Sequence, residues 1–79
     1  MSAPLDGRAA RARRPIEWAR RELRDDIASK QAAIAALENK RARELARHES
    51  TVSTDHSLAL ARRRLAAAQE RLAALESQP

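Results

Sequence analysis

The chain has 79 residues and a formal net charge of +5 at pH 7, with one Trp, one Gly, no Phe, no Tyr and no Cys. This composition excludes a conventional globular core, disulfide bonds and thiolate catalysis, and it is rich in the helix formers Ala, Leu, Arg and Glu. Because no apolar run approaches the roughly 18 residues of a membrane span and residues 1–15 lack a hydrophobic signal core, we expect a soluble, cytoplasmic protein.

Residues 1–14 are predicted to form a flexible, Arg-rich N-terminal arm. Positive charge is concentrated at this end, because residues 1–24 hold seven Arg against three acidic side chains, which accounts for +4 of the total +5. The planar guanidinium group suits carboxylate and phosphate partners. The expected contacts of the arm with an acidic surface or a phosphate backbone are made by Arg8, Arg11, Arg13 and Arg14.

A long amphipathic helix is predicted over residues 15–50. Pro15 suits the first helical turn, and at 1.5 Å per residue the helix is about 50 Å long. The spacing of apolar residues changes between Leu37 and Leu45, which resembles a stutter across Arg41. The apolar stripe consists of Ile16, Leu23, Ile27, Ile34, Leu37 and Leu45.

Residues 51–54 are predicted to be a turn and residues 55–77 a second helix. The step of six residues from Val52 to Leu58 fits no continuous seam, so the chain is expected to fold back there. Ser53 or Thr54 is expected to cap the second helix. The second helix carries a strict heptad seam made of Leu58, Ala61, Leu65, Ala68, Leu72 and Leu75.

These elements predict an all-α fold, an antiparallel two-helix coiled-coil hairpin in which the first helix is the longer. Some of the arginines at positions 62–64 are expected to pair with Glu38, Glu44 or Glu70 across the hairpin. Few large apolar side chains are available to offset the conformational entropy of folding, so we expect a homo-oligomer or a bound partner. The residues expected to hold the hairpin together are Ile34, Leu37, Leu45, Leu58, Leu65, Leu72 and Leu75.

The unequal helix lengths predict an uncovered apolar strip over residues 16–27. Folding back about residue 53 would place Leu58 near His48, so the second helix would end before reaching this strip. Exposed apolar strips mark interaction surfaces, and Trp and Arg dominate binding hot spots. Alternatively, Trp18 packs at the end of the seam or acts as a hydrophobic staple. The expected partner-binding residues are Ile16, Trp18, Arg20, Arg21, Leu23, Arg24 and Ile27.

The residues with metal-binding chemistry are His48, Glu49, Asp55 and His56, which flank the predicted turn. Their spacing matches no ordinary metal motif, and helix capping and dipole effects account for them, so no metal site is expected. The sequence contains no glycine-rich phosphate loop and no triad of nucleophile, base and orienting group. We therefore expect neither an enzyme nor a cofactor or small-molecule substrate.

The sequence predicts a non-enzymatic interaction or assembly protein that docks through the uncovered strip and the arm onto a partner protein or a second copy. The alternative is a nucleic-acid-associated accessory protein, for example part of an RNA- or DNA-containing particle, whose arm contacts phosphates without reading sequence. Interleaved aromatics, zinc knuckles and a reading helix are missing, so sequence-specific recognition is not expected. Peripheral attachment to anionic lipid is a third possibility but not the expected one, because only the strip of Ile16, Trp18 and Leu23 could serve as the apolar face.

Overall fold

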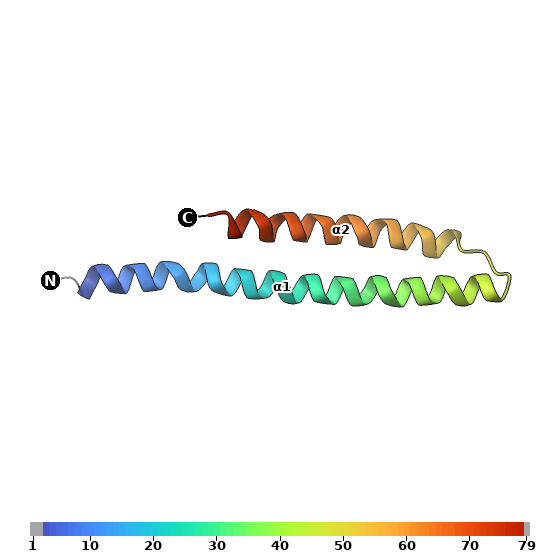
Figure 1. The fold of residues 1–79 in the computed structure, drawn as a ribbon, viewed down its shortest axis with the longest axis horizontal. Coiled ribbons are helices and arrows are strands. Elements are labelled where there is room, and N and C mark those ends of the chain that lie inside the picture. The colour runs from blue at the N-terminus through green and yellow to red at the C-terminus, as the bar shows by residue number, and fades with distance from the viewer. Residues whose placement is uncertain (1–2, 79) are drawn as a thin grey trace.

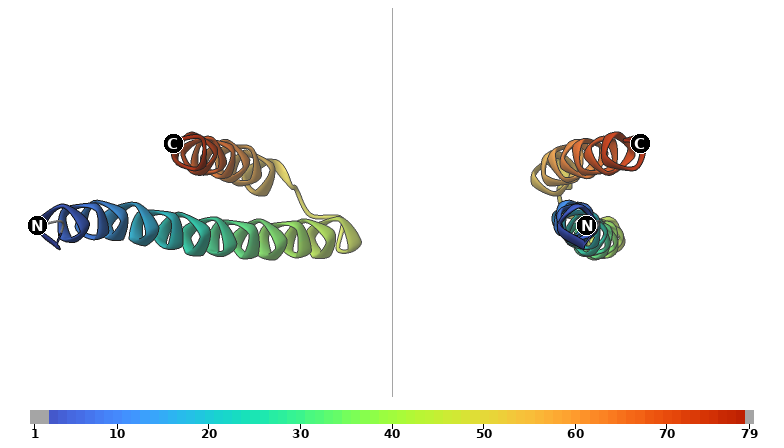
Figure 2. Two further views of the ribbon diagram at one scale, coloured as in Figure 1. Left: turned by 60° about the vertical axis from the view of Figure 1, so that its left-hand side comes forward. Right: turned by 90° about the vertical axis from the view of Figure 1, so that its left-hand side faces the viewer.

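The chain forms a long, narrow helical hairpin. The computed structural model describes the backbone of residues 3–78 and the side chains of residues 15–78. Helix α1 (Ala3–Ala46) and helix α2 (Val52–Glu76) run antiparallel in a rod of 73 × 15 × 13 Å (Figure 1). Two further views show α2 beside α1 along its whole length, while the N-terminal part of α1 continues beyond it (Figure 2). The predicted all-α hairpin with a longer first helix is confirmed.

The helix boundaries differ from the predicted ones. α1 continues through Pro15 to Ala3, so residues 3–14 are helical where a flexible arm was predicted. Proline disfavours a helix on its N-terminal side, but this segment is dominated by Ala and Arg, which are strong helix formers. At the other end, α1 stops at Ala46 and α2 already begins at Val52. The contacts predicted for the arm involve side chains outside the described residues, namely those of Arg8, Arg11, Arg13 and Arg14.

α1 ends in a Schellman motif centred on His48, whose φ of 56° lies in the left-handed region. The backbone N–H of His48 donates to the carbonyl of Leu45 at 3.1 Å, and that of Glu49 donates to the carbonyl of Glu44 at 2.8 Å. These two bonds define the motif, which usually has glycine at the left-handed position. Histidine is among the residues that tolerate this conformation. The chain therefore turns before residue 51, without the glycine that would have marked the site.

The start of α2 is held by polar contacts around Thr51. The backbone N–H of Asp55 donates to the carbonyl of Thr51 at 2.7 Å, and the hydroxyl of Thr51 donates to the carboxylate of Asp55 at 2.9 Å. Asp55 thus lies in the first turn, where a negative charge interacts favourably with the helix dipole. The predicted capping residues Ser53 and Thr54 lie inside α2 instead.

The core between the helices is thin. Among the described side chains, Thr54, Leu58 and Ala68 are buried, with 1%, 3% and 1% of their surface exposed. Thr54 lies four residues before Leu58 and so extends the alternating three- and four-residue spacing of the α2 seam towards the turn. The residues along the facing stripe of α1 are half-buried, and they are Leu23, Ile27, Lys30, Ile34, Leu37, Arg41 and Glu44. Leu65, Leu72 and Leu75 of α2 are also half-buried.

The register of the two helices differs from the predicted one by about two helical turns. Leu58 was expected beside His48, but it lies beside Arg41 and Leu45, with which it lines a shallow groove. Leu45 was predicted to be a seam residue, yet its side chain is 51% exposed. The α1 seam passes through Glu44 in its place, and the regular spacing removes the need for a stutter. Sequence reasoning missed this path because the seam residues next to the turn are polar.

Candidate interaction surfaces

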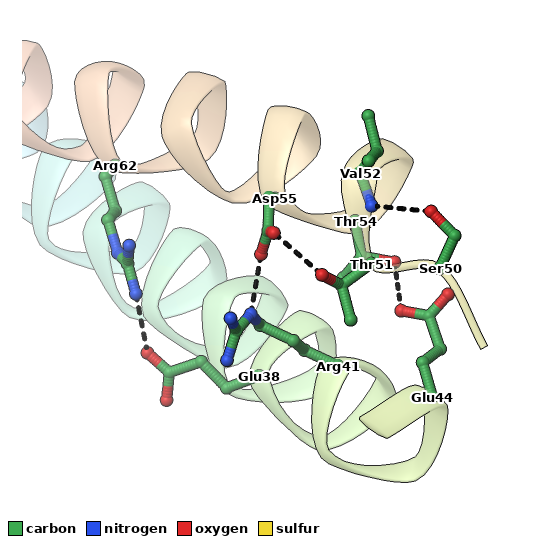
Figure 3. A network of polar contacts seen from close by, with 9 residues as sticks. All are labelled: Glu38, Arg41, Glu44, Ser50, Thr51, Val52, Thr54, Asp55 and Arg62. Atoms are coloured by element: carbon green, nitrogen blue, oxygen red, sulfur yellow. Dashed lines mark hydrogen bonds and ion pairs between the residues drawn. The ribbon is translucent and has the colours of Figure 1, made fainter. Parts of the chain in front are cut away.

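One edge of the hairpin, here called the paired edge, carries ion pairs between the two helices. A guanidinium nitrogen of Arg62 lies 3.4 Å from the carboxylate of Glu38, one of the three acids expected to pair with the arginines at positions 62–64. Nearer the turn, Nε of Arg41 donates to the carboxylate of Asp55 at 2.6 Å (Figure 3). At the far end of α2, a guanidinium nitrogen of Arg24 lies 3.0 Å from a carboxylate oxygen of Glu76. Exposed pairs of this kind are each worth only about 0.2–1 kcal/mol, but together they favour one helix register over its competitors.

A buried polar contact lies next to the turn, inside the seam. The hydroxyl of Thr54 donates to the carboxylate of Glu44 at 2.5 Å (Figure 3). Thr54 is almost fully buried and Glu44 is half-buried, so water reaches this contact poorly. A hydrogen bond to a charged group in such a place is worth about 1.5–3 kcal/mol. The contact therefore fixes the alignment of the two helices where they leave the connection.

The polar contacts of the paired edge lower the pKa of Asp55. The hydrogen bond from Arg41, followed by that from the Thr51 hydroxyl, holds the pKa of the Asp55 carboxyl below its ordinary value of 3.8. A carboxyl whose pKa is lower in the folded state stabilises the fold when ionised. This contribution is present above the ordinary value and is lost as the pH falls through the folded-state pKa.

In Asp55→Asn, stability is therefore expected to fall less than in the wild type when the pH is lowered below about 4. The measurement is the thermal unfolding midpoint by circular dichroism between pH 2 and pH 7, with Asp25→Asn as the control. Asp25 is an exposed carboxylate that forms no ion pair with the described side chains. Identical pH profiles for the two variants would contradict the stabilising role of the Arg41 contact.

The N-terminal end of α1 extends beyond α2. Because the last residue of α2, Glu76, pairs with Arg24, residues 15–22 have no helix opposite them; we call this stretch the docking end. Trp18 lies there with 61% of its surface exposed. Its indole borders a shallow, open hollow whose other lining residues are Ala19, Glu22, Leu23, Asp25 and Asp26. Apolar surface and negative charge therefore meet at this hollow.

The predicted partner-binding residues fall into two groups. Trp18, Arg21 and Arg24 are exposed, whereas Ile16, Arg20, Leu23 and Ile27 are half-buried. Ile27 was expected to be uncovered, but it lies within the length of α1 that α2 covers, because α2 reaches as far as Arg24. The uncovered stretch therefore ends earlier in α1 than predicted. In the docking end, Nε of Arg20 is buried and has no hydrogen-bond partner among the described residues.

Within the described part of the chain, the histidines and acids near the turn form no metal site. No group of three or more His, Cys, Asp or Glu side chains within it is placed to hold a metal ion. Over the same residues, neither helix combines the length and the apolar character that crossing a bilayer requires.

Comparison with protein-family models, with curated proteins and with solved structures finds no match to this chain.

Proposed function

We propose that this chain is a cytoplasmic, non-enzymatic interaction or assembly protein that docks through the docking end of α1, together with its Arg-rich N-terminal segment, onto a partner protein or a second copy. The observation that carries the proposal is Trp18, the one aromatic side chain of the sequence, exposed on a stretch that α2 leaves uncovered. Tryptophan is enriched among the residues that dominate binding energy. An exposed tryptophan on an otherwise aromatic-free rod therefore supports a docking role.

The total surface of the chain supports association as well. Its accessible surface is 6436 Å². A compact folded monomer of 8.8 kDa is expected to expose about 4,800 Å². The excess follows from the elongated shape of the hairpin, which leaves more surface for association than a compact monomer of the same mass has.

The hollow beside Trp18 indicates the chemistry of the partner. Glu22, Asp25 and Asp26 place carboxylates around the indole, so a guanidinium group could stack on the ring and pair with an acid at the same time. Arg-rich segments supply such groups, and residues 8–14 of a second copy are one of them. Self-association is therefore the first form of docking to be measured.

Trp18→Ala is expected to weaken the complex at least tenfold while leaving the helix content unchanged, because hot-spot truncations cost about 2 kcal/mol or more. Sedimentation equilibrium of the purified chain measures self-association. If the chain is monomeric, the wild-type and the variant chain are each recovered with their native complexes. The masses of these complexes then show whether the variant has lost its partner. Val52→Ala is the matched control, since Val52 is apolar and 75% exposed but lies at the opposite end of the hairpin. Equal binding by wild type and Trp18→Ala would rule out the docking end.

A second candidate function is that of a nucleic-acid-associated accessory protein. The excess of positive charge in residues 1–24 favours it, because phosphate contacts supply most of the affinity in sequence-independent binding. The dependence of binding affinity on salt concentration distinguishes the two candidate functions. Binding that depends on several phosphates falls steeply between 50 and 200 mM salt, whereas an interface anchored by tryptophan loses much less.

A further inference from the structure

The two edges of the hairpin differ in charge. On α2, Arg62 and Arg64 flank the seam on opposite sides; Arg62 belongs to the paired edge, whereas Arg64 lies beside Ala33 of α1. On α1, Glu38 and Lys40 flank the seam in the same way. The edge opposite the paired edge, here called the basic edge, follows from this spacing and carries Lys40, Arg47, Arg64 and Arg71.

The cations of the basic edge are largely free to bind a partner. All four residues are exposed. Among the described side chains, Arg47 alone of the four comes within ion-pair distance of a carboxylate, that of Glu49, at 4.0 Å. Asp26, an acid on the same side of α1, is held by Lys30 at 2.5 Å. In contrast, the paired edge matches Arg24, Arg41 and Arg62 each with an acid.

The spacing of these charges forms a row. Arg64 and Arg71 are seven residues apart on α2, and Lys40 and Arg47 are seven apart on α1, so each step is about 10 Å along the rod. The contact of Arg64 with Ala33 places the α2 pair beyond Lys40, on the side away from the turn. The row therefore extends about 30 Å in a nearly straight line. Neighbouring cations are about one Debye length apart at physiological salt, so their fields reinforce one another.

A straight row of fixed cations matches a linear polyanion. Ala33, Leu60 and Ala67 lie on the same side of the helices, and no aromatic side chain is present there to stack on a base. Attachment to a bilayer would also require a broad apolar face to bury. Among the side chains that the structure describes, this edge offers only one large apolar one, that of Leu60, with 40% of its surface exposed.

We propose that the basic edge binds the phosphate backbone of a nucleic acid without reading its sequence. The inference rests on the second candidate function for the class of partner, and it assigns the contact to a surface of the hairpin itself, apart from the N-terminal arm and from Trp18. Arg64 and Arg71 are the residues best suited to test it, because both are exposed and neither forms an ion pair with the described side chains.

The test compares two full-length variants that lose the same charge. Arg64→Gln/Arg71→Gln alters the basic edge, and Arg41→Gln/Arg62→Gln alters the paired edge. Binding to a fluorescent single-stranded RNA and to a DNA duplex is titrated between 50 and 200 mM salt, with helix content checked by circular dichroism. Loss of two phosphate contacts should lower the slope of log K against log salt by about 1.4 for the single strand and about 1.8 for the duplex. Over this fourfold salt range, the wild type should lose about seven- to twelvefold more affinity than the basic-edge variant.

The paired-edge variant should keep the wild-type slope. An equal fall in both variants would show that net charge alone is being measured and would overturn the proposal. If the wild type binds and the basic-edge variant keeps the wild-type slope, the edge is not the site, although the second candidate function stands. Absence of binding to both nucleic acids, or binding to anionic phosphatidylserine vesicles alone, would overturn the edge proposal and the second candidate together.

Discussion

Leu58→Ala is expected to destabilise the hairpin by about 2 kcal/mol, the low end of the range for a buried leucine, because a thin core can partly collapse around the missing atoms. Leu58 is the one large apolar side chain that is almost fully buried among the described residues, with 3% of its surface exposed. For a chain of this size, the loss lowers the unfolding midpoint by about 8–16 °C. Thermal unfolding followed by circular dichroism at fixed protein concentration measures the change.

The matched control is Leu60→Ala, the same chemical change two residues further along α2. Leu60 is 40% exposed, and alanine is a slightly better helix former than leucine, so the effect should stay within about 0.5 kcal/mol. Equal destabilisation by the two variants would show that α2 does not pack on α1 through Leu58. The register described above would then be wrong.

The second large effect is expected at the buried contact between Thr54 and Glu44. Glu44→Leu leaves the Thr54 hydroxyl buried without an acceptor and should cost about 1–3 kcal/mol. Glu38→Leu is the matched control, since it removes only an exposed pair, that with Arg62, and should cost less than about 1 kcal/mol. Denaturant unfolding of the purified variants measures both values.

A double-mutant cycle separates this contact from its surroundings. When Thr54→Val is added to Glu44→Leu, both partners become apolar, and stability should return close to that of the wild type. If the losses of the two single variants simply add in the double variant, the two side chains do not interact and the hydrogen bond is absent in solution.

The sequence predicted the type of fold but not its register. The heptad spacing from Leu58 to Leu75 is set by apolar residues, and the hairpin followed from it. The turn was placed too late because His48 adopts a left-handed conformation that usually indicates glycine, and no glycine is present there. Extending the three- and four-residue spacing back from Leu58 to Thr54 would have revealed the polar start of the seam.

The candidate surfaces were predictable to different degrees. The exposed end of α1 followed from the unequal helix lengths, although the corrected register ends it earlier and places Ile27 beside α2. The basic edge was not predicted, because Arg62 and Arg64 are neighbours in sequence. Only the position of the seam between them separates Arg62, which pairs with Glu38, from Arg64, which is exposed and has no acidic partner among the described side chains.

The ion pair between Arg24 and Glu76 lies beside the docking end and has a consequence for how a complex would form. An exposed pair contributes less than about 1 kcal/mol, so the last turn of α2 frays at thermal energies. Each fraying event exposes Leu23 and Leu75, which are half-buried when the helices are closed. A partner that contacts Leu23 therefore binds the frayed form more tightly. By thermodynamic reciprocity, any change that keeps the C-terminal turn of α2 packed on α1 weakens the complex. Faster amide hydrogen exchange around Leu75 on complex formation would be the signature of this linkage.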